Sequence, residues 1–198
     1  LVMAIRKNRH FMSSLSPLLF DTVRLEGGLF VADLMEKICL GNGPLQSRED
    51  YSIPKGLKIE SEYARAFHIA KAQWSAFVSA SKRKDHNGGE PVMDFVVDFL
   101  RDVLGYGAIR EGTSPVYVNG FGYPITLMID GMIPVVVSSA NGLDTASNDF
   151  GVEGGSRRKT PFQLVQEFLN ARDHALWGIV TNGRSIRLLR DSSSLTRP

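Results

Sequence analysis

The stretch that decides the fold is TPFQLVQEFLNARDHALWGIVTNGRSIRLLR, residues 160–190. It opens with the signals of a helix N-terminus, because Thr160 suits the N-cap and Pro161 the first helical position, where a missing N–H costs nothing. Gln163 stands where a capping box places the side chain that reaches back to the N-cap. The apolar stripe of this helix is expected to be Phe162, Val165, Phe168 and Leu169.

The second half of the same stretch predicts a β-hairpin. Trp177, Ile179 and Val180 form a short β-run, and the apolar residues within 186–189 predict the returning strand. Between them, Asn182-Gly183 predicts a two-residue turn in which both residues have positive φ. The stretch is therefore interpreted as helix, strand, turn and strand.

Upstream of this unit, the sequence predicts another helix followed by three short strands. Pro91 stands in the first turn of that helix, and apolar residues recur at helical spacing up to Leu104. The period then changes to two, which is typical of an antiparallel meander. The strands are expected at 116–118, 123–129 and 132–138, with turns at Asn119-Gly120 and Asp130-Gly131.

The chain is expected to divide at a charged, glycine-tipped loop within residues 82–89. Residues 1–88 are predicted as a helical region, and residues 89–198 as an α/β domain, of the α+β kind, in the order α-β-β-β-α-β-β. In the helical region, helices are expected over 29–40 and 59–81. The second helix carries an aromatic stripe that is interpreted as core: Tyr63, Phe67, Ala70, Trp74, Phe77 and Val78.

Composition limits the classes of protein that the chain can belong to. It has 198 residues, 43% of them hydrophobic, and 23 Lys+Arg against 21 Asp+Glu, so any basic surface must be local. A single cysteine, Cys39, excludes an internal disulfide; it is expected to be a buried thiol in the reducing cytoplasm. No apolar run approaches a membrane span, so no membrane partner is expected. Both ends suggest a piece of a larger protein.

The order of helix, three-stranded meander, helix and strand is the core topology of PD-(D/E)XK nucleases, and the segment from residue 91 resembles such a core. In those enzymes an Asp and a Glu-x-Lys hold Mg²⁺ and activate water. Asp130 occupies roughly the first acidic position, although it equally suits an Asp-Gly turn. The third strand and its continuation, residues 134–140, have neither acid nor lysine; Asp144 and Glu167 are the weak replacements. The nuclease chemistry is therefore expected to be lost from a retained scaffold.

A second resemblance covers most of the chain. Residues 161–191 and the following SSSLTR resemble the N-terminal region of large bacterial type IIG-like restriction–modification methylases, some of which serve phage defence. Residues 20–30, 104–107 and 123–125 fit the same region. The resemblance implies an adenine-N6 DNA methyltransferase that uses S-adenosylmethionine, with the other domains of that protein, or other defence-system subunits, as partners. This segment has no methyltransferase motif, since Ser114-Pro115-Val116-Tyr117 lacks the required Asn and second Pro.

A basic loop is the candidate contact for DNA. Arg157, Arg158 and Lys159 stand immediately before Thr160, where the N–H groups and dipole of a helix N-terminus favour phosphate. Such cations would position a nucleic-acid backbone without reading its bases. Arg184, on the predicted hairpin, is added to this set, although ordinary strand-surface charge explains it as well. A solvated basic loop remains the alternative for the whole set.

Three hypotheses follow from the sequence. In the first, the chain is a nuclease-like N-terminal domain that contributes DNA contacts or domain docking, without cleavage or a cofactor of its own. In the second, it is an active Mg²⁺-dependent endonuclease that uses Asp130 with Asp144 or Glu167. In the third, it is an interaction module that does not touch DNA. The histidines lack metal-ligand spacing, so no zinc site is predicted.

Overall fold

The structure is a computed structural model that describes residues 23, 30–31, 33–82, 90–139 and 142–191. Residues 192–197 and most of 20–30, two of the methylase-like segments, lie outside these residues. Two compact units divide at residue 61, rather than at the loop near residue 88, so most of α2 (Ile59–Ser81) belongs with the α/β part. In the first unit, α1 (Leu34–Cys39) is shorter than the predicted helix, and Cys39 is exposed rather than buried.

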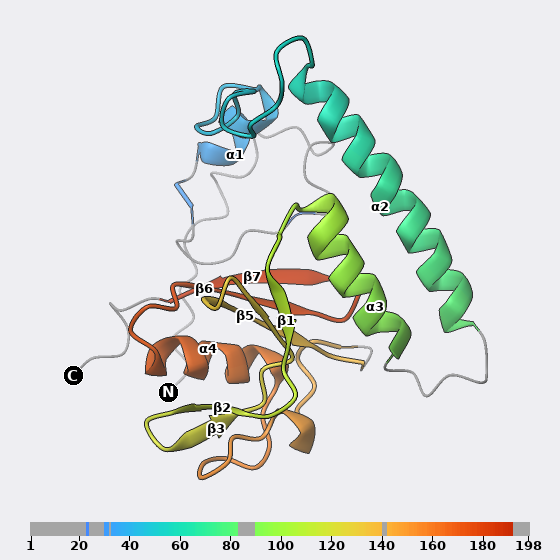
Figure 1. Ribbon diagram of the computed structural model, residues 1–198. Coiled ribbons are helices and arrows are strands. Elements are labelled where there is room, and N and C mark those ends of the chain that lie inside the picture. The colour runs from blue at the N-terminus through green and yellow to red at the C-terminus, as the bar shows by residue number, and fades with distance from the viewer. Residues whose placement is uncertain (1–22, 24–29, 32, 83–89, 140–141, 192–198) are drawn as a thin grey trace, which may run out of the picture. The chain divides into compact units, whose positions relative to one another are not determined.

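A mixed sheet of five strands forms the centre of the second unit (Figure 1). Its order is β1 (Ile109–Glu111), β4 (Leu127–Ile129), β5 (Ile133–Val137), β6 (Trp177–Thr181) and β7 (Ile186–Arg190). Neighbouring strands are antiparallel except β5 and β6, which are parallel and joined through α4 (Pro161–Ala171). The chain therefore has the α+β architecture that was expected, with helices packed on a mixed sheet.

The meander differs from the prediction in its first strand. The first strand is β1, whereas residues 116–118 form β2 (Val116–Val118), which pairs only with β3 (Phe121–Tyr123) as a separate hairpin. The predicted strand over 123–129 is broken between β3 and β4, where Pro124 has no N–H to donate to a ladder. Both turns are confirmed: Asn119 and Gly120 have φ of 51° and 83°, and Asp130 and Gly131 have φ of 51° and 68°.

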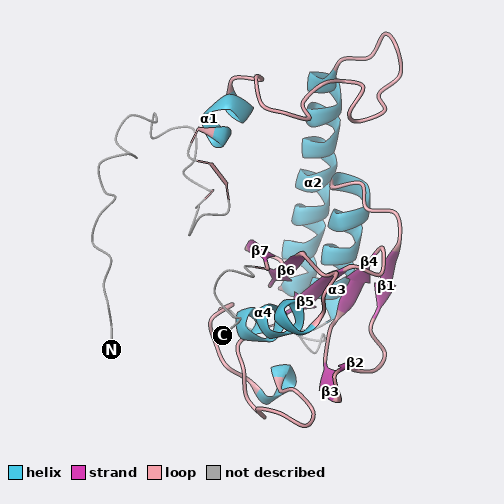
Figure 2. Cartoon of the chain, turned by 90° about the vertical axis from the view of Figure 1, so that its left-hand side faces the viewer, coloured by secondary structure: helices cyan, strands magenta, loops and turns pink. Residues whose placement is uncertain are grey.

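Helices cover both faces of the sheet (Figure 2). One face carries α2 and α3 (Glu90–Asp98), which continues as a π-helical turn, Phe99–Val103, while the other carries α4. Because side chains alternate along a strand, Val135 and Ile179 pack toward α2 and α3, whereas Val136 and Val180 pack toward α4. None of the described helices is long and apolar enough to span a membrane.

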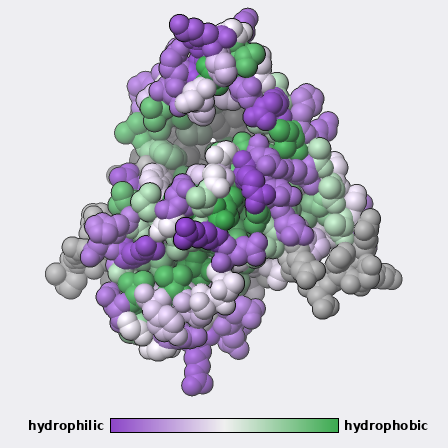
Figure 3. Space-filling view, in the orientation of Figure 1, coloured by the Kyte–Doolittle hydropathy of each residue, from purple (hydrophilic) through white to green (hydrophobic). Residues whose placement is uncertain are grey.

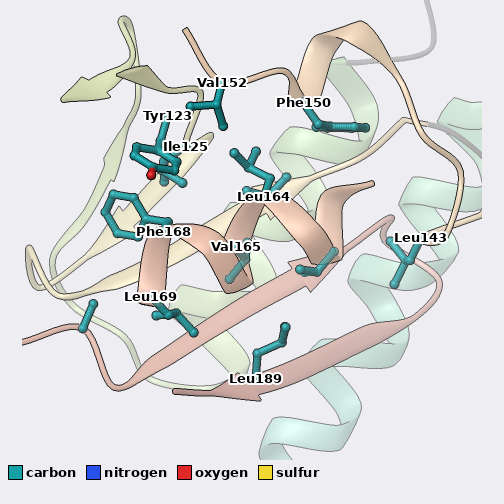
Figure 4. Packing of buried hydrophobic residues seen from close by; sticks show 13 residues of the cluster. Tyr123, Ile125, Leu143, Phe150, Val152, Leu164, Val165, Phe168, Leu169 and Leu189 are labelled. Carbon is teal, nitrogen blue, oxygen red and sulfur yellow. The ribbon is translucent and has the colours of Figure 1, made fainter. Parts of the chain in front are cut away.

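Helix α4 begins as predicted, but the set of residues that it buries differs from the predicted apolar stripe. The Gln163 N–H donates to Thr160 Oγ1 at 3.1 Å, and the Thr160 N–H donates to Gln163 Oε1 at 3.0 Å, which completes the capping box. The buried residues are Pro161, Leu164, Val165, Phe168 and Leu169, of which Figure 4 labels the last four. Phe162 is instead 41% exposed, because the helix turns Leu164 toward the sheet in its place.

The α4 face is closely packed. Phe168 is fully buried and meets Tyr123 edge to face, with 5.4 Å between the ring centroids (Figure 4). Gly178 of β6 lets α4 pack closely on the sheet at Val165, since a Cβ at position 178 would lie only 2.4 Å from Val165 Cγ1. The helix thus sits closer to β6 than any residue with a side chain would permit.

The aromatic stripe of α2 is mostly exposed, contrary to the prediction that it is core. Phe77 is its one buried member among the described residues, stacked on Phe95 of α3 with centroids 4.7 Å apart. Tyr63 and Phe67 are 46% and 68% exposed. Gln73 hydrogen-bonds Asp102 near the end of the π-helical turn, so the first half of α2 runs past its neighbour. Hydrophobic side chains consequently interrupt the polar surface beside α2 (Figure 3).

The hairpin between β6 and β7 has a different turn from the predicted one. Of Asn182 and Gly183, Gly183 alone has positive φ, 77°. Asn182 Oδ1 accepts from the N–H groups of Arg184 and Ser185, and Thr181 Oγ1 accepts from the Gly183 N–H. Side chains therefore hold the loop in a conformation that needs one left-handed residue rather than two.

Candidate nucleic-acid interface

The predicted DNA-contacting residues lie in the two segments that follow the ends of β5 and β6. Strand β5 ends at Val137, the chain crosses to the start of α4, and β6 runs parallel to β5. The loop before α4 and the tip of the β6–β7 hairpin therefore both start at the edge where β5 and β6 end, and the loop continues past α4 to the β2–β3 hairpin (Figure 1). This loop, residues 138–160, carries Arg157, Arg158 and Lys159, and the hairpin tip carries Arg184.

The start of α4 is already satisfied by its own chain. The capping box uses the Thr160 hydroxyl, the Thr160 N–H and the Gln163 N–H, and Pro161 has no N–H. Few backbone donors are left to bind an anion. The prediction that Thr160 contacts phosphate therefore lacks the open helix mouth on which it was based.

Lys159 is held against the helix. Its Nζ lies 2.5 Å from Glu167 Oε2, and its side chain is only 14% exposed. The backbone groups of Lys159 also pair with those of Ser147 across the loop. Lys159 thus braces the loop against α4, and a ligand would have to compete with Glu167 for its charge.

Arg157 and Arg158 face solvent. Arg158 Nε donates to the Ala146 carbonyl at 3.1 Å, which fixes the base of its guanidinium group. Neither arginine has a carboxylate partner within the part of the chain that the structure describes. The loop beneath them is tightly folded, since a Cβ on Gly151 would lie 2.4 Å from the Arg157 carbonyl oxygen. Arg157 and Arg158 are therefore exposed on a loop whose backbone is tightly packed.

The acidic groups of the same loop are engaged elsewhere. Asp144 forms two hydrogen bonds with Arg187, at 2.5 and 2.6 Å, and the Arg187 guanidinium lowers the pKa of this carboxyl below its ordinary value. Asp149 accepts from the Ser147 hydroxyl at 2.9 Å. Glu153 accepts a hydrogen bond from the Tyr117 hydroxyl, and this bond, together with the negative charge of Glu153, raises the Tyr117 pKa. None of these three carboxylates pairs with Arg157 or Arg158.

The structure does not bring the three candidate metal-binding carboxylates together. Asp130 lies in the β4–β5 turn, and Asp144 lies beyond the other end of β5. The strand between them spans about 13 Å at roughly 3.3 Å per residue. A Mg²⁺ ion shared by these carboxylates needs each ligand oxygen within about 2.1 Å of the metal. Glu167 is paired with Lys159, and no cluster of three or more acidic, His or Cys residues occurs among the described residues.

Arg184 lies at the same sheet edge but belongs to another surface. It lines an apolar groove between α2, α3 and the β6–β7 hairpin, on the face opposite α4. This groove was not predicted from the sequence, because the stripe that contains Phe67 and Trp74 was interpreted as core. A usable signal was present, since the stripe of α2 is longer than the apolar face of the next helix.

Comparisons of the chain with models of known protein families, with curated proteins and with solved structures found no match. A function for this chain therefore rests on its own residues.

Proposed function

We propose that this chain is the N-terminal α/β domain of a bacterial restriction–modification or phage-defence DNA methyltransferase. In this proposal it contacts the DNA backbone through Arg157 and Arg158 and does not cleave DNA itself. Adenine methylation with S-adenosylmethionine belongs to the remainder of the protein, whose other domains, and other defence-system subunits, are its partners.

The topology supports a nuclease-like scaffold. From α3 onward, the strands of the main sheet and the two helices follow the order α-β-β-β-α-β-β, with α3 and α4 on opposite faces. The β2–β3 hairpin is an insertion between the first and second strands of the meander. Because a fold does not determine a function, the scaffold supports the proposal only together with the site.

The exposed arginine pair is the observation that carries the DNA contact. Arg157 and Arg158 are adjacent cations on a braced loop, without carboxylate partners among the described residues, next to a helix start. Arginine suits phosphate because its planar group donates two parallel hydrogen bonds. A fixed loop also loses less conformational entropy on binding than a free one.

Separated carboxylates support the absence of cleavage. Metal-dependent hydrolysis requires ligands that converge on one ion, and Asp130, Asp144 and Glu167 occupy three separate places. Asp144 and Glu167 are each already paired with a basic residue, which holds their charge away from a shared metal. Incubating the protein with duplex DNA and Mg²⁺ or Mn²⁺ should leave the DNA intact. Cleavage that disappears in Asp130→Ala would instead establish the endonuclease alternative.

A binding measurement tests the arginine pair. Fluorescence anisotropy of a labelled 20-base-pair duplex should show weaker binding by the Arg157→Ala/Arg158→Ala variant than by the original protein. Arg101→Ala/Arg110→Ala is the matched control, because it removes the same charge from exposed positions away from the loop. Equal weakening in both variants would show that only net charge matters. Unchanged binding in the loop variant would remove the pair from the interface.

A further inference from the structure

The groove on the α2 and α3 face is a second surface with the properties of a binding site. Its volume is about 500 Å³, within the range of small-molecule sites. Phe67 and Trp74 of α2 form one wall, Phe99 lies beside α3, and Ile179 and Ile186 of the hairpin form the other wall. It lies entirely within the second unit, so α2 and the hairpin form it together.

The walls of the groove are apolar and incompletely covered. Phe67, Trp74 and Ile186 are 68%, 39% and 49% exposed. The hydroxyl of Thr181, which also lines the groove, already accepts a hydrogen bond from the Gly183 N–H. An occupant therefore gains mainly by burying its own apolar surface.

The charges of the groove select the kind of occupant. Lys71 of α2 and Arg184 of the hairpin tip both line it, both are exposed, and neither has a carboxylate partner among the described residues. Two like charges oppose the seating of a second copy of the same groove and attract an anion. Among the described residues, none of those that line the groove is acidic.

We propose that this groove binds an organic anion with an extended apolar body, of which a medium-chain carboxylate is the simplest example. The apolar body lies between α2 and the β6–β7 hairpin, and the anionic group lies at the rim that carries Lys71 and Arg184. This site is separate from the Arg157–Arg158 loop, so it stands or falls independently of DNA contact.

Trp74 provides a direct readout. The chain has two tryptophans, so Trp177→Phe leaves Trp74, in the groove wall, as the single tryptophan, which is excited selectively at wavelengths where tyrosine does not absorb. This protein is titrated with decanoate and with cationic decyltrimethylammonium below their micelle concentrations, and with neutral decan-1-ol below its solubility limit. Decanoate should give a saturable one-to-one response and bind about tenfold more tightly than the cation, as expected for two exposed charges.

Two further variants separate charge from apolar contact. Lys71→Ala/Arg184→Ala should abolish the preference for decanoate over the cation and leave decan-1-ol affinity within about twofold. Ala70→Phe, on the groove wall, should block all three amphiphiles, with its folding checked by thermal melting. The Arg101→Ala/Arg110→Ala and Arg157→Ala/Arg158→Ala variants should retain the decanoate preference.

Three results would overturn the proposal. The first is an equal affinity for all three amphiphiles, which indicates nonspecific adsorption to exposed apolar surface. The second is a decanoate preference that survives the loss of Lys71 and Arg184. The third is the absence of a saturable Trp74 response to decanoate.

Discussion

The two faces of the sheet are built from similar residues, but one is covered by a closed core and the other leaves a groove open to solvent. Against α4, the apolar side chains close into a core in which Phe168, Leu164 and Val165 are fully buried. Against α2 and α3, the sheet is covered near Leu127 and Val135, and a groove is left open beside β7. Since both faces are rich in large hydrophobic residues, hydrophobicity alone does not determine which face closes. The placement of the covering helices does, since the longer helix, α2, lies on the face that stays open.

The largest test of this contrast compares a phenylalanine from each face. Phe168→Ala should lower the free energy of unfolding by about 3–5 kcal/mol, because it leaves a cavity in a packed core. Phe67→Ala, on the exposed half of α2, should change it by less than about 0.5 kcal/mol. Urea denaturation measures both. Similar losses in the two variants would mean that the α2 face is as closed as the α4 face.

A glycine pair tests how closely α4 approaches the sheet. Gly178→Ala should destabilise the protein by about 1–3 kcal/mol, because the new methyl group would meet Val165 Cγ1 at 2.4 Å. Gly107→Ala is the control, since nothing lies within 4 Å of a Cβ at that position. Thermal melting of the two variants reports the difference. Equal melting temperatures would contradict the close contact between helix and strand.

The cap of α4 gives a smaller effect. Thr160→Ala should cost about 1 kcal/mol, because the Gln163 N–H loses its acceptor. Thr160→Ser retains a hydroxyl and should stay close to the original stability in the same urea titration. If the serine variant loses as much as the alanine variant, the hydroxyl is not the stabilising group.

The smallest expected effect is at the Asp144–Arg187 pair. The Asp144 pKa is lowered by the Arg187 guanidinium, so the pair's contribution is present above the ordinary carboxyl pKa and is lost as pH falls through the lowered value. Carboxyl NMR titration should show a higher Asp144 pKa in Arg187→Ala, nearer its ordinary 3.8. An identical pKa in both proteins would show that the pair does not persist in solution.

Local chemistry made much of the second unit predictable. The capping box at Thr160 and Gln163 and the two positive-φ turns depend on neighbouring residues, and the structure contains them. Strand β1 could not be identified because it has three residues, only one of them apolar, and no measurable period. Its pairing with β4 depends on residues far along the chain.

The candidate sites were less predictable for the same reason. The basic run was visible in sequence, but the pairing of Lys159 with Glu167 depends on how the loop folds onto α4. The groove depends on where α3 ends relative to α2. The helical spacing of apolar residues does not indicate how two helices are placed against each other. A helical stripe shows that a face is apolar, whereas only its neighbours determine whether it is buried.

The salt dependence of DNA binding tests the central claim most directly. The slope of log K against log salt should be shallower by about 1.8 in Arg157→Ala/Arg158→Ala, since each lost phosphate contact removes about 0.9 on duplex DNA. The slope of Arg101→Ala/Arg110→Ala should match that of the original protein. An unchanged slope in the loop variant, or the same decrease in both variants, would contradict the assignment of the DNA contact to this loop.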